Sequence, residues 1–420
     1  MICIVSVILC LCGRKENEEV SGTFQLNEIK INGIINADSY TEVDPNLNIY
    51  LAFSEDIDQS TLQNITLLTE RGQTVDLIFD IQGKTITVSP TKVLSSYSSY
   101  QFIINTGLKS TTGNRIFTGK VYSISTGLDN SDKFPRISDE ELLTLVQRQT
   151  FTYFWDFGHP VSGMARERSS SGDIVTTGGT GFGIMAMIVA VERQFINRES
   201  AVERLLKTVR FLKDDATRYH GAFSHWLNGI SGKTQPFSEK DNGADIVETS
   251  FLFQGLLTAR KYFNGNNSEE TELRLLITEL WEEVEWNWFR RNNEDVLYWH
   301  WSPNYDWEMN HKIKGWNECL ITYVLAASSP TFPISKSVYD NGWADNGNIR
   351  NNGTYYDFKL PVGPSYGGPL FFAHYSFLGL DPRNLNDQYA SYWQQNVNHT
   401  KINQAYCIRN PLNHLGYSNV

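Results

Sequence analysis

Three acidic residues, Asp241, Asp245 and Glu248, stand at a spacing that brings carboxylates together. On a helix, positions i, i+4 and i+7 share one face. The residues among and after them, as far as Leu257, are apolar nearly all round, which predicts a helix buried on most sides. The macrodipole favours acids in the opening turns of such a helix. Asp241 or Asp245 alone is explained as the N-cap, whereas three acids together favour acid–base chemistry.

A fourth acid, Glu318, repeats this arrangement. It begins a second apolar run within Gly315–Pro330 and follows Trp316 closely. Burial among aromatic rings disfavours the charged form of a carboxyl group and raises its pKa. A carboxyl that stays protonated near neutral pH can serve as a general acid. The alternative is an acid satisfied by hydrogen bonds in the core.

Aromatic and charged side chains in the same part of the chain suit a carbohydrate ligand. All 11 tryptophans lie at or after Trp155. Sugar rings present apolar C–H faces to aromatic rings and hydroxyls to carboxylates. Core packing alone accounts for about half of such tryptophans. The candidate substrate contacts are Trp155, Asp156, Arg166, Trp226, Trp299, Trp301 and Trp316.

Several other chemistries are disfavoured. The glycine run Gly178–Gly183 opens a helix, but no strand precedes it in a βαβ unit and no Gly-Lys-Ser/Thr follows, so close packing and cleft-lining N–H groups are favoured over nucleotide binding. The eight histidines show no metal-binding spacing; His220 and His225 lack an HExxH pattern. No Gly-x-Ser-x-Gly elbow occurs. We therefore expect no metal and no cofactor.

Composition narrows the partners. The net charge of -11 argues against nucleic acid or an anionic membrane surface as partner. The five cysteines show neither a disulfide framework nor a zinc spacing. We expect a polysaccharide or oligosaccharide partner and a monomeric protein.

The chain divides into four parts. Residues 1–20 form an apolar leader and polar tether that resemble a bacterial lipoprotein signal, with Cys12 or Cys10 as the lipidated residue; an ordinary secretory leader is the alternative. A periplasmic or cell-surface, membrane-anchored protein is expected. Residues 21–128 predict a β-sandwich, and residues 129–137 a linker. Residues 138–420 are predicted to be helical. The predicted strands are Leu26–Ile35, Leu47–Phe53, Thr74–Phe79, Thr85–Val88, Tyr100–Ile104 and Lys120–Ser125.

The helical part starts with a capping box, Ser138 to Glu141. Apolar runs at Ile184–Val191 and Cys319–Ala327 predict inner helices, and the amphipathic stretches Ser200–Lys213 and Glu269–Glu285 predict outer ones. This alternation is typical of an α/α toroid. The predicted helices span 139–156, 181–195, 199–216, 244–263, 268–290, 314–327, 366–379 and 385–397.

Several stretches taken together resemble a known family. They are Phe151–Asp156, Ala165–Arg168, Gly178–Ala186, Asp241–Leu257, Gly315–Pro330, Pro369–Tyr375 and Leu378–Arg383. The region of about residues 140–418 resembles the bacterial endo-β-1,2-glucanases (glycoside hydrolase family 144), whose relatives are often labelled putative glucoamylases. Residues 21–128, through Phe53–Asp58 and Tyr100–Ile104, resemble the bacterial Ig-like domains that precede many secreted enzymes.

The resemblance implies an (α/α)6 toroid and metal-free, inverting hydrolysis of linear β-1,2-glucan to sophorose and short oligosaccharides. It implies that Asp241, Asp245 and Glu248 form the acidic cluster, that Glu318 is the acid, and that His374 joins the substrate contacts. Members of the family carry further helices and an acid-bearing loop, so we expect an incomplete ring here. Two alternatives stay open: a catalytically degenerate carbohydrate-binding surface lipoprotein, and an α-glucan hydrolase on the same toroid.

Overall fold

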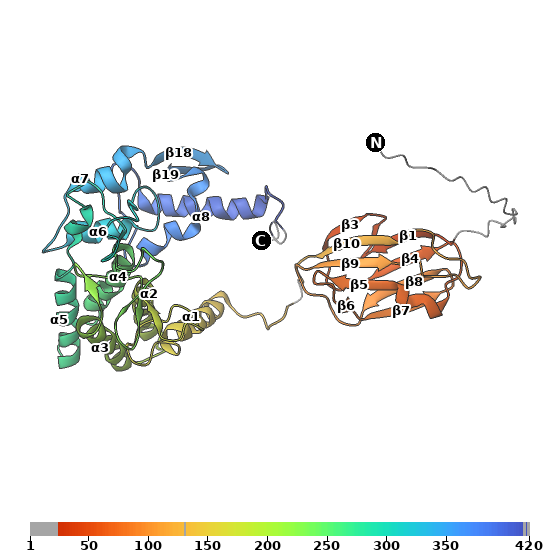
Figure 1. The fold of residues 1–420 in the computed structure, drawn as a ribbon, viewed down its shortest axis with the longest axis horizontal. Coiled ribbons are helices and arrows are strands. Elements are labelled where there is room, and N and C mark those ends of the chain that lie inside the picture. Colours follow the sequence, from red (N-terminus) through yellow and green to blue (C-terminus); the bar gives the residue numbers. More distant parts are fainter. Residues whose placement is uncertain (1–23, 130–131, 415–416, 418–420) are drawn as a thin grey trace, which may run out of the picture. The chain divides into compact units, whose positions relative to one another are not determined.

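The computed structural model describes residues 24–129, 132–414 and 417. It divides into two compact units, one built mainly from residues up to Pro135 and one spanning Arg136–Arg409 (Figure 1). Each unit has its own hydrophobic core. The predicted leader, with Cys10 and Cys12, lies outside the described residues.

The first unit is a β-sandwich of two five-stranded sheets, with strand orders β2-β1-β4-β8-β7 and β3-β10-β9-β5-β6. The β3–β10 pair is parallel and the other pairs are antiparallel. Alternate residues of β4, Ile49, Leu51 and Phe53, point into the core. The strands are β1 Leu26–Ile31, β2 Ile34–Ile35, β3 Ser39–Val43, β4 Ile49–Phe53, β5 Ile65–Thr69, β6 Thr74–Val75, β7 Leu77–Gln82, β8 Thr85–Pro90, β9 Ser99–Ile104 and β10 Lys120–Thr126.

Turn residues set the connections of this sandwich. Asn32 and Gly33 both adopt positive φ, 44° and 87°, between β1 and β2, as a two-residue hairpin requires. The sequence pattern missed β3 and β5. The single predicted segment Leu26–Ile35 is in fact the hairpin β1–β2.

The second unit is mainly helical. Its helices are α1 Asp139–Trp155, α2 Thr177–Glu192, α3 Arg198–Asp214, α4 Ile246–Tyr262, α5 Ser268–Glu282, α6 Leu320–Ser328, α7 Lys336–Val338 and α8 Tyr392–Arg409. Short strands lie in the loops: β11 Ile174–Thr176, β12 Arg218–Tyr219, β13 Ala222–Phe223, β14 Trp226–Asn228, β15 Thr234–Gln235, β16 Ala244–Asp245, β17 His300–Trp301, β18 Arg350–Tyr355 and β19 Phe358–Val362. The predicted capping box of α1 is present, with Ser138 and Glu141 bonded reciprocally.

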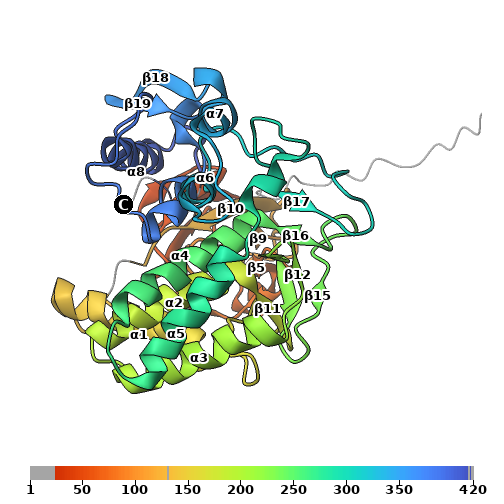
Figure 2. The same ribbon diagram turned by 90° about the vertical axis from the view of Figure 1, so that its left-hand side faces the viewer.

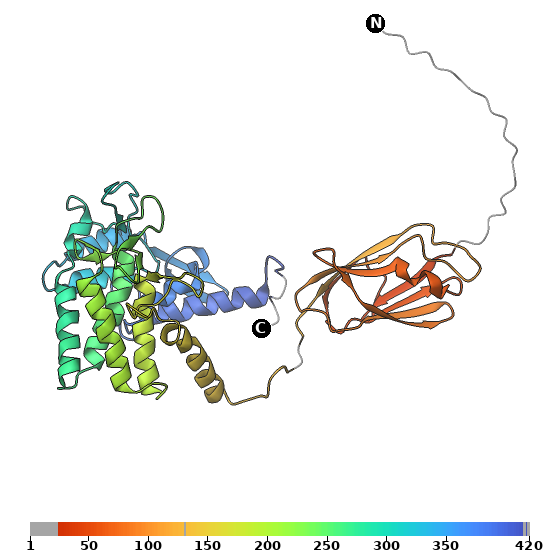
Figure 3. The ribbon, with the colours of Figure 1, turned by 60° about the horizontal axis from the view of Figure 1, so that its bottom comes forward.

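Helices α2, α3, α4 and α5 lie side by side (Figures 2 and 3). Most residues of α4 are buried, as predicted, whereas α3 and α5 keep charged faces in solvent. Helices α2 and α4 cross with their backbones almost in contact. A Cβ on Gly181 would lie 2.0 Å from the Phe251 carbonyl oxygen, and one on Gly255 would lie 2.2 Å from the Gly181 carbonyl oxygen. The glycine run therefore serves close helix packing.

Four predicted helices differ from the structure. Residues 366–379 form short 3-10 turns, because Gly367 and Gly368 adopt positive φ (96° and 81°) and Pro369 has no N–H to donate. The predicted helix 385–397 is instead α8, which begins at Tyr392. The predicted helix 314–327 begins only at Leu320, so Glu318 precedes it. Segment 268–290 ends as an α-helix at Glu282 and adds a 3-10 turn at Trp286–Arg290.

Within the described residues, Cys319 and Cys407 are free thiols. The helices found there are all too short or too polar to span a lipid bilayer.

Candidate active site

The acidic cluster lies where a short strand runs into a buried helix. Asp245 ends β16, which pairs with β17 so that Asp245 faces His300 and Ala244 faces Trp301. Helix α4 begins at the next residue, and Asp245 is its N-cap. The prediction that all three acids share one helical face is therefore wrong, because only Glu248 lies on the helix. The N-cap alternative holds for Asp245.

The Asp245 carboxylate is surrounded by donors. Its Oδ1 accepts the backbone N–H groups of Val247 (3.0 Å) and Glu248 (2.9 Å). Its Oδ2 accepts Nδ1–H of His225 (3.1 Å) and Nε1–H of Trp299 (3.3 Å). The residue is fully buried. Burial alone would raise the pKa of Asp245, but these bonds and the nearby His225 and His300 outweigh it and lower that pKa.

Glu248 projects from the first turn of α4 to the start of α2. Its Oε2 accepts the backbone N–H of Gly178 at 2.9 Å. A Cβ on Gly178 would lie 2.4 Å from the same oxygen, so the approach depends on glycine. Burial, followed by the negative charge of Asp245, raises the pKa of Glu248 to about 7. This carboxyl therefore exchanges a proton near neutral pH.

Asp241 lies in the loop before β16 and is 5% exposed. Its Oδ2 lies 3.4 Å from Nε2 of His300. Burial and the charge of Asp245 raise the pKa of Asp241 to about 7. Burial lowers the pKa of His300, although the negative charge of Asp245 opposes this effect.

Glu318 approaches the same region from the start of α6. Burial raises the pKa of Glu318, opposed only by a hydrogen bond from its own backbone N–H. The next residue, Cys319, is fully buried. Burial raises the pKa of the Cys319 thiol, and the negative charges of Glu318, Asp245 and Glu248 raise it further. The thiol, rather than the Glu318 carboxyl itself, therefore lies within electrostatic reach of Asp245 and Glu248.

Three of the predicted substrate contacts surround these acids. Trp299 bonds to Asp245 and stacks on His311, with ring centroids 4.9 Å apart. Trp301 follows in β17 and packs against Trp288 (5.4 Å). Trp226 begins β14 beside His225. All three tryptophans are partly exposed, so the acids lie under an aromatic rim.

The other predicted contacts lie elsewhere. Trp155 stacks on Phe151 and carries the Arg204 guanidinium over its ring (4.5 Å). Its neighbour Asp156 is exposed. Arg166 donates to the backbone carbonyls of Phe157 and Gly172 within its own loop.

The last two predicted contacts lie on the side of α8. Trp316 is 5% exposed and donates to Nδ1 of His399 at 3.4 Å, so it is a core residue of that helix packing. His374 is exposed and lines an apolar groove of about 400 Å³ beside α8. Among the described residues, neither Trp316 nor His374 makes a hydrogen bond or ring contact with any of the four candidate acids.

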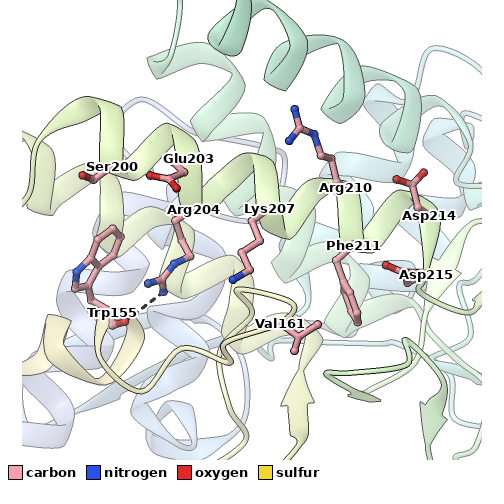
Figure 4. A pocket seen from close by; sticks show the side chains of 10 residues that line it. All are labelled: Trp155, Val161, Ser200, Glu203, Arg204, Lys207, Arg210, Phe211, Asp214 and Asp215. Atoms are coloured by element: carbon pink, nitrogen blue, oxygen red, sulfur yellow. Dashed lines mark hydrogen bonds between the residues drawn. The ribbon is translucent and has the colours of Figure 1, made fainter.

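A groove of about 640 Å³ runs along α3 (Figure 4). Arg204, Lys207 and Arg210 form a row on one side of it. Phe151 and the Arg204 guanidinium both pack against the Trp155 ring, and none of the four candidate acids lines the groove. We therefore place the chemistry at the acidic cluster and not in this groove.

One set of side chains has metal-like geometry. His225, Asp241 and Asp245 present ligand atoms that all lie within 4.8 Å of one another. However, His225 Nδ1 and Asp245 Oδ2 are already joined by a 3.1 Å hydrogen bond, and both Asp245 oxygens accept N–H groups. Protons thus satisfy these atoms without an ion.

The sequence interpretation missed three residues of this site, His225, His300 and Phe237. Phe237 is 50% exposed and stacks on His225 (4.3 Å) and against Trp226 (4.9 Å). The alternation Trp299-His300-Trp301 next to an acidic segment was the available signal for His300. Pairing with β16 could not be foreseen, because a two-residue strand has no periodicity.

Comparison with known proteins adds family evidence. Residues 310–420 match the family described as "Putative glucoamylase", and residues 27–126 match the "Bacterial Ig-like domain" family. A curated relative from Parabacteroides distasonis, an exo β-1,2-glucooligosaccharide sophorohydrolase (non-reducing end), is 46% identical over 325 residues. That match covers 71% of this chain and 45% of the relative, so the chain spans about half the length of the curated relative.

The matches to solved structures cover a larger share of each relative's chain. A putative glucoamylase from Bacteroides uniformis is 56% identical, with a TM-score of 0.66, and the match covers 68% of this chain and 70% of that one. An endo-β-1,2-glucanase from Chitinophaga pinensis, in complex with sophorotriose and glucose, is 50% identical with a TM-score of 0.65; the match covers 67% and 70%. The chain therefore belongs to the family of bacterial endo-β-1,2-glucanases and their putative-glucoamylase relatives, with a bacterial Ig-like domain before the family region.

Proposed function

We propose that this protein hydrolyses β-1,2-linked glucan at the acidic cluster, with Glu318 as the general acid. The observation that carries the proposal is the position of the half-buried Glu318 just before α6, which packs against α4, the helix that carries Glu248. Burial raises the pKa of Glu318 while no cation among the described residues offsets it. A protonated carboxyl of this kind is what departure of a sugar oxygen requires.

We propose an inverting reaction. Glu318 gives its proton to the glycosidic oxygen as the bond from that oxygen to the anomeric carbon breaks. A water molecule attacks the opposite face of the same carbon and loses its proton to a second carboxylate. Asp245 is unsuited to that second role, because four N–H groups already occupy its oxygens. Glu248 and Asp241, whose pKa values are both about 7, are the remaining candidates in the cluster.

We propose endo action that yields sophorose and short oligosaccharides, as in the relative from Chitinophaga pinensis named as an endo-β-1,2-glucanase. The curated relative supports a second candidate, the exo release of sophorose from non-reducing ends. For the fold, we propose that the helical unit follows an (α/α)6 toroid, supported by the buried α2 and α4 and the amphipathic α3 and α5.

The remaining proposals concern the cellular setting. We propose a monomer at the periplasm or cell surface, anchored through lipid on Cys12 or Cys10, with the Ig-like domain as a spacer. The apolar run before Gly13 and the cysteines within it support this proposal.

A polysaccharide panel tests the function. The purified chain is incubated with β-1,2-glucan, α-1,4-glucan and a β-1,3-glucan, and reducing ends are measured. We expect release only from β-1,2-glucan, and a loss of about 10²–10⁴-fold in Glu318→Gln. Glu308→Gln is the matched control, because Glu308 is exposed and its ion pair is with Lys240. An early fall in polymer size indicates endo action, whereas sophorose alone indicates exo action.

Three outcomes would count against this assignment. Full activity in Glu318→Gln removes Glu318 as the acid. Activity on α-1,4-glucan alone supports the other hydrolase alternative. Binding of β-1,2-glucan without any product supports the degenerate carbohydrate-binding alternative.

A further inference from the structure

The Asp245 carboxylate is placed to act through other groups, because it is fully buried and all of its partners are protein donors. Two of these donors are backbone N–H groups of α4 and one is the indole of Trp299. Only the fourth, Nδ1–H of His225, belongs to a side chain that can carry a charge. His300 lies farther from Asp245, with Nε2 at 3.8 Å.

The surroundings of His225 favour its cationic form. Burial opposes protonation, but the hydrogen bond from His225 to Asp245 and the charges of Asp245, Glu248 and Asp241 raise the pKa of His225 to about 9. Two further titratable neighbours face the imidazole: Glu167, whose pKa it lowers, and His300. Aromatic rings complete the enclosure, with Phe237 stacked at 4.3 Å and Trp226 edge-on at 5.7 Å.

The backbone also ties His225 to the start of α2. The carbonyl oxygen of His225 accepts the N–H of Thr177 at 3.1 Å. The next residue of α2, Gly178, donates its N–H to Glu248. Thus the same histidine contacts Asp245 through its side chain and, through its carbonyl, the helix end that holds Glu248.

We propose that His225 is a positioning residue, whose ion pair with Asp245 holds that carboxylate as a permanent anion and thereby controls the protonation of Glu248 and Asp241. This inference rests on the proposed function. At Glu248 and Asp241, the positive charge of His225 offsets the negative charge of Asp245. Without the cation they face the full charge of Asp245, and both carboxyls retain their protons to higher pH.

The variant His225→Asn separates charge from hydrogen bonding, because the Asn amide nitrogen can donate from about the position of Nδ1 but carries no charge. His220→Asn is the matched control. His220 Nδ1 also contacts a carboxylate, Glu285 Oε2 at 3.0 Å, and its ring stacks on Trp288 at 3.5 Å. None of the four candidate acids is among these contacts of His220.

Two NMR titrations need no turnover. In the full chain with labelled histidine, we expect the His225 imidazole to titrate with a midpoint near pH 9. With labelled carboxyl carbons, we expect the Glu248 and Asp241 midpoints to rise by about one pH unit or more in His225→Asn and to stay unchanged in His220→Asn. A His225 midpoint at or below 6.5, or unmoved carboxyl midpoints, overturns the proposal.

If the chain hydrolyses β-1,2-glucan, the acidic limb of its kcat/KM profile should move upward by the same interval in His225→Asn alone. A merely structural role lowers activity without moving that limb. Titrations with EDTA and with added Zn²⁺ test the alternative, in which His225, Asp241 and Asp245 bind a metal ion. A His225 signal that stays neutral and responds only to Zn²⁺ replaces the ion pair with a metal site. Absence of hydrolysis refutes the proposed function, while the NMR midpoints still decide the role of His225.

Discussion

Substitution of Gly181 by Ala tests the helix crossing that supports the site. The new Cβ would lie 2.0 Å from the Phe251 carbonyl oxygen and 2.7 Å from the Leu252 Cα. Ordinary contact begins at 3.4 Å, so α2 and α4 must separate by about 1.4 Å. Because the obstacle is backbone, we expect the upper end of the overpacking range, about 3 kcal/mol. The higher helix propensity of alanine returns about 1 kcal/mol, which leaves a net loss of about 2 kcal/mol.

This loss corresponds to a decrease in Tm of roughly 4–8 °C for a unit of this size. Thermal unfolding followed by circular dichroism measures it directly. Gly179→Ala is the matched control, because its Cβ would meet only the Thr176 side chain, at 2.5 Å from a methyl carbon. Rotation of that threonine relieves the contact, so we expect Gly179→Ala to unfold within about 2 °C of wild type or above it.

A second measurement follows from the same geometry. Gly178 holds Glu248 from the first turn of α2, so a displaced α2 should also weaken hydrolysis or binding of β-1,2-glucan in Gly181→Ala. If Gly181→Ala unfolds at the same temperature as Gly179→Ala, the two backbones are not in the contact described, and the explanation of the glycine run fails.

Three further predictions concern other residues. Phe237→Ala should raise KM for β-1,2-glucan roughly fivefold, about 1 kcal/mol, with kcat nearly unchanged, because this half-exposed ring lies beside the acids; an unchanged KM contradicts it. Glu270→Gln should lower the free energy of unfolding in urea at pH 7 by about 2–3 kcal/mol, because hydrogen bonds from Arg198 lower the pKa of Glu270 to about 2. The difference in stability from wild type should shrink as the pH falls from about 4.5 toward 2, where Glu270 takes up its proton in the folded protein. A difference that stays constant over this pH range speaks against the ion pair. Ser138→Ala should cost about 1 kcal/mol and speed hydrogen exchange mainly in α1, whose capping box with Glu141 it removes; unaltered exchange there argues against the cap.

Local signals in the sequence predicted much of the fold. The capping box at Ser138, the buried run that became α4 and the amphipathic α3 each follow from side-chain chemistry within a few residues. These features depend on neighbours in the chain, so they are visible without coordinates.

The arrangement of the acids was harder to predict. The spacing of Asp241, Asp245 and Glu248 suggested one helical face. Asp245 is instead the last residue of β16 and the N-cap of α4, so the helix begins only after it. Trp316 was expected beside the substrate and instead packs on α8, because its position depends on contacts with residues about 80 positions away, such as His399. Tryptophans of the core and of a binding rim have the same identity in a sequence.

The four donors to Asp245 also bear on the order of folding. Val247 and Glu248 are immediate neighbours, but His225 and Trp299 come from segments on either side of β16 that meet only when the chain is compact. Contacts between distant segments form later than helices during refolding. The burial of the Asp245 carboxylate should therefore be among the last steps of folding. Protection of the neighbouring backbone amides from hydrogen exchange would then mark the formation of the native state.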